Sequence, residues 1–327
     1  MTTPLLEVDD LAVSFPLKRS SLRLHAPRLH AVAGVSFSVR AGETVGLVGE
    51  SGSGKSTIAR AIVGLEQVTG GDIRFDGESL LTMSRGRRRE VGRQIQMVFQ
   101  DPYSSLHPRM TVLDAICEGW RHNPGIVPRQ QWKPRALEIM ERVGLSPDHA
   151  SRLPGQFSGG QRQRIGIARA LALEPRMIVF DEPVSALDVS IQAQILNLLA
   201  DLQRDLGLTS LFIAHDLAVV RHISDDINVM YLGKLAETGP AEAVFGDPRH
   251  PYTRALLSAV PQITVNPSAR PDGTRGLSGE IPSPADPPSG CRFRTRCPLA
   301  QPQCAEVVPG FVDLGDRHRA ACHLVVA

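Results

Sequence analysis

Residues 49–57 have the spacing of a phosphate-binding loop, G-x-x-x-x-G-K-[ST]. Glycines let backbone N–H groups curl around phosphate oxygens, and the N-terminus of a following helix favours an anion. Lys55 supplies a positive charge, and Ser56 offers a hydroxyl to Mg²⁺. A strand-like run precedes the loop and helix-forming residues follow it, as this chemistry requires. The candidate phosphate contacts are Gly49, Glu50, Ser51, Gly52, Ser53, Gly54, Lys55, Ser56 and Thr57.

Two acids end a second strand-like run, residues 177–180. Acids at the carboxyl end of a strand lie where open α/β sheets bind ligands. Asp181 is therefore expected to hold Mg²⁺, directly or through water, and Glu182 to polarise an attacking water. Because strands often end in an acid, this pair alone is weak evidence for a nucleotide site. It becomes stronger evidence in a chain that also has the phosphate-binding loop.

A Ser-Gly-Gly turn opens a further helix and makes a second anion-binding N-terminus. It consists of Ser158, Gly159, Gly160 and Gln161, and Phe157 precedes it. One chain thus carries two helix N-termini that favour phosphate. This turn resembles the signature motif of the ABC-transporter ATPases, in which two subunits sandwich ATP between the phosphate loop of one and the signature of the other.

The resemblance covers roughly residues 5–245 and implies roles for further residues. Gln100 looks like the glutamine that ligates Mg²⁺ and senses the membrane partner, Asp188 like the residue that organises the dimer, and His215 like the histidine that contacts the γ-phosphate. Phe15 is the best match for the aromatic side chain that stacks on adenine, which is usually Tyr in this family; the alternative is an ordinary core aromatic.

The elements around these motifs predict an α/β fold. Short β-rich runs alternate with helical ones, which favours a P-loop NTPase core with a mainly parallel sheet. Strands are expected at 44–48, 177–180, 210–214 and 227–232, and apolar residues recurring at helical spacing from Ile191 to Leu206 predict a helix. The domains expected are a nucleotide-binding domain at 1–260 with an inserted helical subdomain at about 100–165, and a Pro-rich linker with a small Cys-rich extension at 261–327.

Composition narrows the class of protein. Hydrophobic residues make up 42% of the chain and charged residues 21%, which excludes a disordered or coiled-coil protein. The net charge of +2 gives no reason to expect a nucleic-acid partner. No apolar run approaches the length of a spanning helix and the start lacks a targeting pattern, so a cytosolic location is expected.

Three segments resemble one branch of the family, the oligopeptide/dipeptide permeases. They are QDPYSSLHPRMTV at 100–112, HPYTRAL at 250–256, and the stretch from Gly279 to Cys291. The resemblance implies a peripheral ATPase subunit, of the second-subunit type, at the cytoplasmic face of the plasma (inner) membrane. Its partners would be two transmembrane permeases, a related but different ATPase chain and, indirectly, an extracytoplasmic peptide-binding protein; ATP and Mg²⁺ would be required.

Other functions are compatible with part of this pattern. An importer of glutathione or nickel chelates would use a similar ATPase. A soluble ABC ATPase of DNA repair or translation is disfavoured, because no heptads occur between Lys55 and Ser158 and the chain holds one ATPase unit.

Four cysteines crowd the last part of the chain, where few large apolar residues are present to build a core. Small segments without a core are often held by a metal. The irregular spacing favours a [4Fe–4S] cluster over zinc, and the family branch also suggests a cluster. Reduced or disulfide-linked structural cysteines remain an alternative, with His318 and His323 as other candidate ligands. The four are Cys291, Cys297, Cys304 and Cys322.

Overall fold

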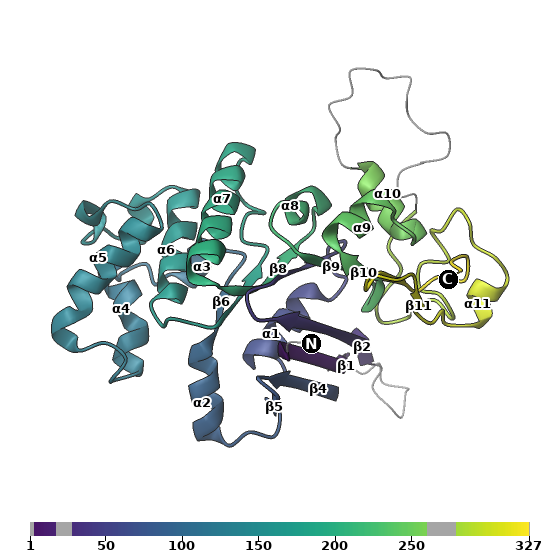
Figure 1. Ribbon diagram of the computed structural model, residues 1–327, viewed down its shortest axis with the longest axis horizontal. Helices are drawn as coiled ribbons and strands as arrows, with labels where there is room; N and C mark the ends of the chain where they lie inside the picture. The colour runs from purple at the N-terminus through teal and green to yellow at the C-terminus, as the bar shows by residue number, and fades with distance from the viewer. Residues whose placement is uncertain (1–2, 18–27, 260–278, 327) are drawn as a thin grey trace. The chain divides into compact units, whose positions relative to one another are not determined.

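The computed structural model describes residues 3–17, 28–259 and 279–326, which fall into two compact units (Figure 1). Most of the expected Pro-rich linker lies outside the described residues. Unit 1 contains Met1–Val39, Thr44–Leu81 and Ala214–Ala327, and unit 2 contains Arg40–Glu43 and Thr82–Ile213.

Unit 1 holds β1 (Pro4–Pro16), β2 (Arg28–Arg40), β3 (Thr44–Val48), α1 (Lys55–Val63), β4 (Gly70–Phe75), β5 (Glu78–Ser79), α8 (Leu217–Arg221), β9 (Asp226–Tyr231), β10 (Lys234–Pro240), α9 (Ala241–Gly246), α10 (Pro251–Ala259), α11 (Gln303–Glu306), β11 (Val312–Asp313) and β12 (Arg319–Ala320). Unit 2 holds α2 (Arg85–Gln94), β6 (Ile95–Val98), α3 (Pro102–Ser105), α4 (Val112–His122), α5 (Trp132–Arg142), α6 (Gly159–Leu171), β7 (Met177–Asp181), α7 (Val189–Leu206) and β8 (Thr209–Ala214). Short 3₁₀ turns occur at Arg129–Gln131, Pro147–His149 and Pro154–Gln156.

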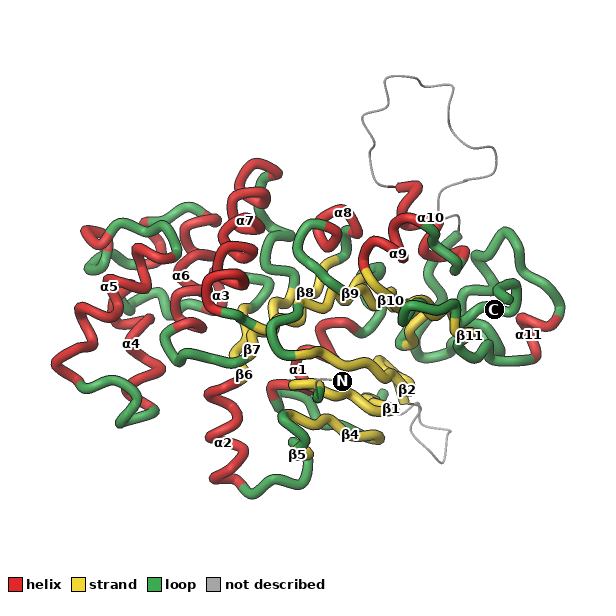
Figure 2. The backbone as a smooth tube through the Cα atoms, viewed as in Figure 1, coloured by secondary structure: helices red, strands yellow, loops and turns green. Residues whose placement is uncertain are grey.

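Unit 1 contains strands of two sheets (Figure 2). The first has the order β2-β1-β4-β5, and β1 pairs antiparallel with β4, so that Leu6 lies opposite Phe75 and Val8 opposite Ile73. The second runs β11-β12-β10-β9-β3 within this unit. Every residue of β3 is buried, and β3 pairs in parallel with β9. A strand buried on both faces gives the loop that follows it a rigid base.

The expectation of a mainly parallel sheet is wrong for much of unit 1. Strands β9 and β10 are antiparallel, as are the β10–β12 and β11–β12 pairs. The physical reason is the tight turn at Leu232 and Gly233, which have φ of 45° and 81° and join β9 directly to β10. Two central residues with positive φ make the turn that matches the twist of a hairpin. The sequence of β10, KLAETGP, carries no β-rich signal that would have revealed it.

Unit 2 contains the parallel strands β6, β7 and β8, and helices fill the chain between β6 and β7. Figure 1 shows α4, α5 and α6 gathered together in this unit. The predicted helix is confirmed as α7, which buries Ile195, Leu199 and Leu202. Leu206, expected on the same apolar face, is 42% exposed because the helix ends there at Gly207.

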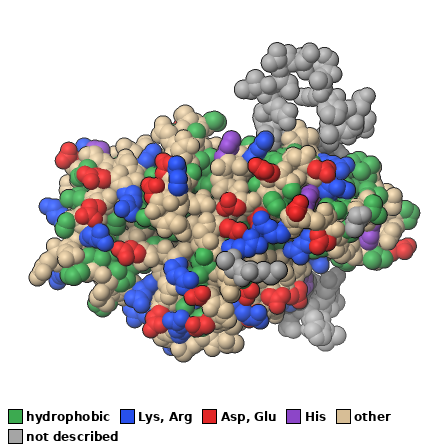
Figure 3. All heavy atoms as spheres, viewed as in Figure 1, with side chains coloured by type: hydrophobic (Ala, Val, Ile, Leu, Met, Phe, Trp, Pro, Cys, Tyr) green, Lys and Arg blue, Asp and Glu red, His purple; other side chains and the backbone are tan. Residues whose placement is uncertain are grey.

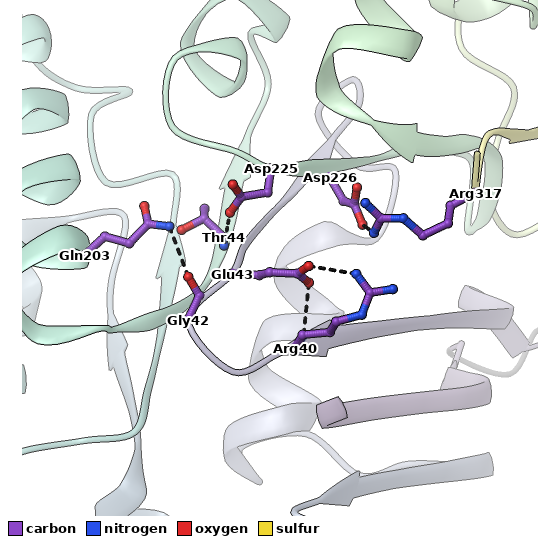
Figure 4. Close-up of polar contacts among 8 residues, drawn as sticks. All are labelled: Arg40, Gly42, Glu43, Thr44, Gln203, Asp225, Asp226 and Arg317. Carbon is purple, nitrogen blue, oxygen red and sulfur yellow. Dashed lines mark hydrogen bonds and ion pairs between the residues drawn. The ribbon is translucent and has the colours of Figure 1, made fainter. Parts of the chain in front are cut away.

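Polar contacts fix the ends of strands in each unit (Figure 4). In unit 1 the backbone N–H of Thr44 donates to Asp225 at 2.8 Å, and Arg317 forms an ion pair with Asp226. In unit 2 the side chain of Gln203 donates to the carbonyl of Gly42 at 3.4 Å. The contact of Asp225 places the start of β9 beside the start of β3, and that of Asp226 joins it to the segment that precedes β12.

The surface mixes charges of both signs. On the face drawn in Figure 3, basic and acidic side chains are interspersed. Among the described residues, no helix combines the length and apolar character needed to cross a membrane.

His250 is a buried junction between α10 and the C-terminal extension. Its side chain is 3% exposed, its Nδ1 accepts the backbone N–H of Tyr252 at 3.0 Å, and it bonds the backbone of Ala321. Burial lowers the pKa of His250 from 6.5 to about 4, with the bond to Ala321 opposing the shift. The imidazole is therefore neutral in the folded protein at neutral pH.

Acid is expected to weaken the fold through this residue. The unfolded chain takes up a proton at His250 near pH 6.5 while the folded chain does so only near pH 4, so stability is full above pH 6.5 and falls between these values. The loss is on the order of 3 kcal/mol. Denaturant unfolding of wild type and His250→Asn, which keeps an acceptor near Nδ1, should give curves that converge as pH falls from 7 to 4. Parallel curves across that range would contradict the assignment.

Candidate active site

The phosphate loop in unit 1 follows β3 and ends where α1 begins, as predicted. Two of its glycines are required by close backbone approach. A Cβ on Gly49 would lie 2.0 Å from the carbonyl oxygen of Met230, and one on Gly54, which has φ of 106°, would lie 2.2 Å from that of Ala31. Neighbouring backbone therefore fixes the curl of the loop from outside.

Lys55 is the buried cation of this loop. Its side chain is 3% exposed, and its Nζ donates to the carbonyls of Gly49 at 2.7 Å and Glu50 at 3.0 Å. The hydroxyl of Ser53 is buried and has no hydrogen-bond partner within the described part of the chain. A buried ammonium, a buried hydroxyl and the N-terminus of α1 together suit a phosphate group. Ser51 and Gly52 are exposed, and Ser56 and Thr57 are half-buried in the first turn of α1.

Two further predicted residues lie in unit 1. His215 is exposed directly after β8 and precedes Asp216, which caps α8 by accepting the N–H of Ala218 at 2.7 Å. Phe15 is half-buried near the end of β1. Its side chain is thus partly accessible.

The carboxylates of unit 2 occupy the carboxyl end of β7. Asp181 is the last residue of that strand and is 2% exposed. Glu182 follows with φ of 47°, a left-handed conformation that a non-glycine residue rarely adopts and that is enriched at functional sites. Its N–H donates to the carbonyl of Ile213 at 3.0 Å. The side chain of Gln100 donates to Glu182 Oε2 at 2.9 Å, so the structure brings these two predicted residues together.

The Ser-Gly-Gly turn begins α6 with a reciprocal cap. Ser158 Oγ accepts the N–H of Gln161 at 3.3 Å, and Gln161 Oε1 accepts the N–H of Ser158 at 3.0 Å. Ser158 is exposed, whereas a Cβ on Gly160 would lie 2.4 Å from the side chain of Ile191. Asp188 is exposed at the N-cap of α7. The turn thus offers its helix N-terminus to solvent in unit 2.

The four C-terminal cysteines line one small cavity of unit 1, together with His323. All are free thiols. Burial raises the pKa of Cys291, Cys297 and Cys322, which a backbone N–H two residues later opposes in each case and neighbouring thiols reinforce. Cys304 Sγ accepts the N–H of Gln301 at 3.5 Å. Within the described residues, no group of three or more His, Cys, Asp or Glu side chains is arranged so that it could hold a metal ion as it stands.

The two histidines weighed as ligands differ. His323 Nε2 lies 3.0 Å from the carbonyl oxygen of Val307, at the edge of the cysteine cavity. His318 Nε2 lies 2.8 Å from Glu237 Oε1, so that ring is engaged in a buried pair with β10.

Sequence reasoning missed two residues that touch the phosphate loop. Tyr252 Oη accepts the N–H of Glu50 at 3.0 Å, and Arg296 forms an ion pair with the Glu50 carboxylate. Tyr252 lies in the HPYTRAL segment, whose sequence resembles one family branch but does not indicate a contact with the loop. Arg296 carries no local signal, because an arginine between two cysteines has no pattern that points to a loop 246 residues away.

Alanine substitutions at Gly52 and at Gly54 should separate the cost of backbone strain from the cost of a close contact. Gly52→Ala introduces only an unfavourable φ of +78°, because nothing lies within 4 Å of its Cβ, and should cost roughly 1–2 kcal/mol. Gly54→Ala adds a contact of 2.2 Å with backbone and should cost more and also reduce nucleotide binding. Denaturant unfolding and a fluorescent ATP analogue would measure both effects; equal costs for the two variants would contradict the close-packed loop.

Two family models match the chain, one described as "ABC transporter" at residues 32–185 and one as "Oligopeptide/dipeptide transporter, C-terminal region" at residues 236–304. The chain is 52% identical over 320 residues to an oligopeptide transport ATP-binding protein, OppF, of Salmonella typhimurium, covering 97% of this chain and 95% of the relative. It is 49% identical to AppF of Bacillus subtilis, another oligopeptide transport ATP-binding protein, covering 98% and 97%.

Two solved structures of ABC transporter components are also similar to the chain. The ATP-binding cassette MJ0796, in a dimeric post-hydrolysis state bound to ADP and phosphate, is 28% identical with a TM-score of 0.64, covering 72% of this chain and 98% of that one. CbiO1 of Clostridium perfringens, part of the ABC transporter complex CbiONQ, is 27% identical with a TM-score of 0.64, covering 75% and 91%.

Proposed function

The chain belongs to the ATP-binding proteins of ABC transporters, and on that premise we propose that it hydrolyses ATP to power a membrane importer of di- and oligopeptides. The observation that carries the proposal is similarity over 97% of the chain to a protein named for oligopeptide transport. The match at residues 236–304 to a C-terminal region of oligopeptide/dipeptide transporters favours peptides over other solutes.

The first half of the chemistry is assigned to the phosphate loop. Lys55 and the loop amides would bind the β- and γ-phosphates, which suits a buried ammonium that donates to carbonyls of the loop. Ser56, Gln100 and Asp181 would hold Mg²⁺, which when bound withdraws negative charge from the phosphates. His215 would contact the γ-phosphate, and Phe15 would stack on adenine.

The second half is assigned to Glu182. It would accept a proton from the water whose oxygen attacks the γ-phosphorus, while the bond to ADP breaks and phosphate leaves. The hydrogen bond from Gln100 and the strained backbone conformation both support a fixed position for this carboxylate.

The active form is proposed to be a pair of ATPase subunits, in which Ser158, Gly159, Gly160 and Gln161 act on the nucleotide of the partner and Asp188 organises the contact. Exposure of Ser158 at the start of α6 supports this role. A related cassette is dimeric after hydrolysis. The remaining partners proposed are two permeases, a related but different ATPase chain and an extracytoplasmic binding protein, at the cytoplasmic face of the inner membrane.

Glu182→Gln is expected to bind ATP but to lose hydrolysis by on the order of 10²–10⁴-fold, because the amide cannot accept the proton. Phosphate release and nucleotide binding would be measured on the same preparations. Glu138→Gln, at an exposed helical site, is the matched control and should hydrolyse normally. Near-normal turnover by Glu182→Gln would remove Glu182 from the base role.

The transport assignment is tested by tagging Glu182→Gln, solubilising membranes in mild detergent with ATP, and identifying the co-purified proteins by mass spectrometry. Two multi-spanning permeases and a related ATPase are expected. A captured binding protein that prefers glutathione or a nickel chelate would correct the solute. Ribosomal or DNA-repair proteins alone would overturn transport and leave the ATPase chemistry standing.

We also propose the domain division 1–260, with its helical subdomain at about 100–165, and 261–327, whose four cysteines hold a [4Fe–4S] cluster; zinc is the alternative. Support comes from four thiols around one cavity and from backbone N–H groups that donate to their sulfurs, contacts of the kind that tune iron–sulfur clusters. A coordinating metal would reverse the raised pKa values, because a ligating thiol is deprotonated.

Anaerobically purified protein should contain iron and absorb broadly in the visible range, and Cys304→Ser should lose both. Cys117→Ser is the matched control, because that buried thiol lies in α4 of unit 2. Stoichiometric zinc without colour would favour the alternative metal, and protein without either metal would favour structural thiols.

A further inference from the structure

Arg296 of the cysteine-bearing extension is joined to the phosphate loop by a two-pronged ion pair. Its Nη1 lies 2.6 Å from Glu50 Oε2 and its Nη2 lies 3.0 Å from Glu50 Oε1. The Arg296 side chain is 4% exposed and that of Glu50 is 21% exposed. Bidentate arginine–carboxylate pairs are among the strongest and most directional polar contacts in proteins, and burial removes the screening that weakens surface pairs.

The guanidinium of Arg296 also contacts a cluster of aromatic side chains. Arg296 Nη1 donates to Tyr231 Oη at 3.4 Å, and the ring of Tyr231 packs edge-on against Tyr252 and Phe293 at centroid distances of 4.7 and 5.2 Å. Tyr252 and Phe293 also pack at 5.3 Å. Phe293 is 2% exposed and lies between Cys291 and Cys297 in sequence, so this cluster fixes the segment that carries Arg296.

Glu50 is therefore gripped at two points by residues of the C-terminal part of unit 1. Its N–H donates to Tyr252 Oη at 3.0 Å, and its carboxylate is bound by Arg296. Its carbonyl accepts from Lys55 at 3.0 Å. The residue that follows the first glycine of the loop thus has its donor and its charge committed to fixed partners.

The charge of Glu50 makes the pair consequential for an anionic nucleotide. A carboxylate within a loop that cradles phosphates repels them, and the repulsion is strong where water is excluded. Arg296 neutralises that charge and holds the carboxylate in a fixed orientation. Lysine cannot reproduce the planar fork that does this.

We propose that Arg296 is a positioning residue for the nucleotide: it neutralises and orients Glu50, so that the cysteine-bearing extension is a working part of the phosphate site. The inference rests on the proposed ATPase function and deepens it. Arg296 acts through Glu50 and needs no contact with ATP itself.

The test measures MgATP affinity, KM and kcat of the full-length chain by calorimetry and phosphate release. Arg296→Met should weaken MgATP binding and raise KM by roughly tenfold or more, within the range of typical coupling between sites. At saturating MgATP, kcat should stay within about threefold, as expected when ground-state and transition-state binding are lost alike. Arg296→Lys keeps the charge and most of the volume, and its MgATP affinity should lie between those of wild type and Arg296→Met.

The decisive variant is the double substitution Arg296→Met with Glu50→Gln. Removing the unpaired carboxylate should restore MgATP affinity to within about threefold of wild type, because the repulsion disappears with the charge. A merely structural arginine predicts no rescue. Arg294→Met is the matched control, because Arg294 lies in the same segment and bonds Ser289 instead, and it should bind MgATP as wild type does.

Each outcome bears on one claim. Unchanged affinity in Arg296→Met and Arg296→Lys, or a double variant as weak as the single one, would overturn the positioning role. If Arg296→Met does not fold, the double variant and Arg296→Lys still decide the question. A wild-type chain that fails to bind MgATP would instead overturn the proposed ATPase function, as would normal binding by Lys55→Ala.

Discussion

An ammonium group held almost entirely out of water is the constraint on which unit 1 depends. Lys55 is 3% exposed, and an unpaired buried cation would cost several kcal/mol. Two carbonyls of the loop, those of Gly49 and Glu50, accept hydrogen bonds from this charged group. That arrangement requires the loop to curl tightly, and the curl requires glycine where the carbonyls of Met230 and Ala31 approach. The buried strands β3 and β9 keep the loop's base in register.

The extension is attached to the core of unit 1 by buried polar contacts as well as by the aromatic packing of Phe293 against Tyr231 and Tyr252. Its own apolar cluster is small, built on Ala320, Cys322 and Val325. Glu237, fully buried in β10, accepts the N–H groups of Arg249 and His250 and pairs with His318. Such contacts are directional, and breaking one leaves a buried charge without its partner, so they fix a unique docking geometry where a small core would permit several.

The features that could be predicted from the sequence are local motifs, whereas contacts between distant segments could not be predicted. The phosphate loop, the acids after β7 and the helix α7 were recognisable because each is encoded by spacing within a few residues. The bond between Gln100 and Glu182 was not predicted, because the sequence indicated only a separate role for each residue. The hairpin at Leu232 and Gly233 escaped because β10 lacks a β-rich pattern. The contacts of Tyr252 and Arg296 with Glu50 escaped because polar pairs between distant segments leave no periodicity in either one.

The distance in sequence between Glu50 and Arg296 also orders events in time. The two residues are 246 positions apart, and ribosomes add about 5–20 residues per second, so Glu50 precedes its partner by on the order of 10–50 s. The ion pair between the phosphate loop and the extension can therefore form only after most of the chain has been synthesised, which makes it a late contact in the assembly of unit 1.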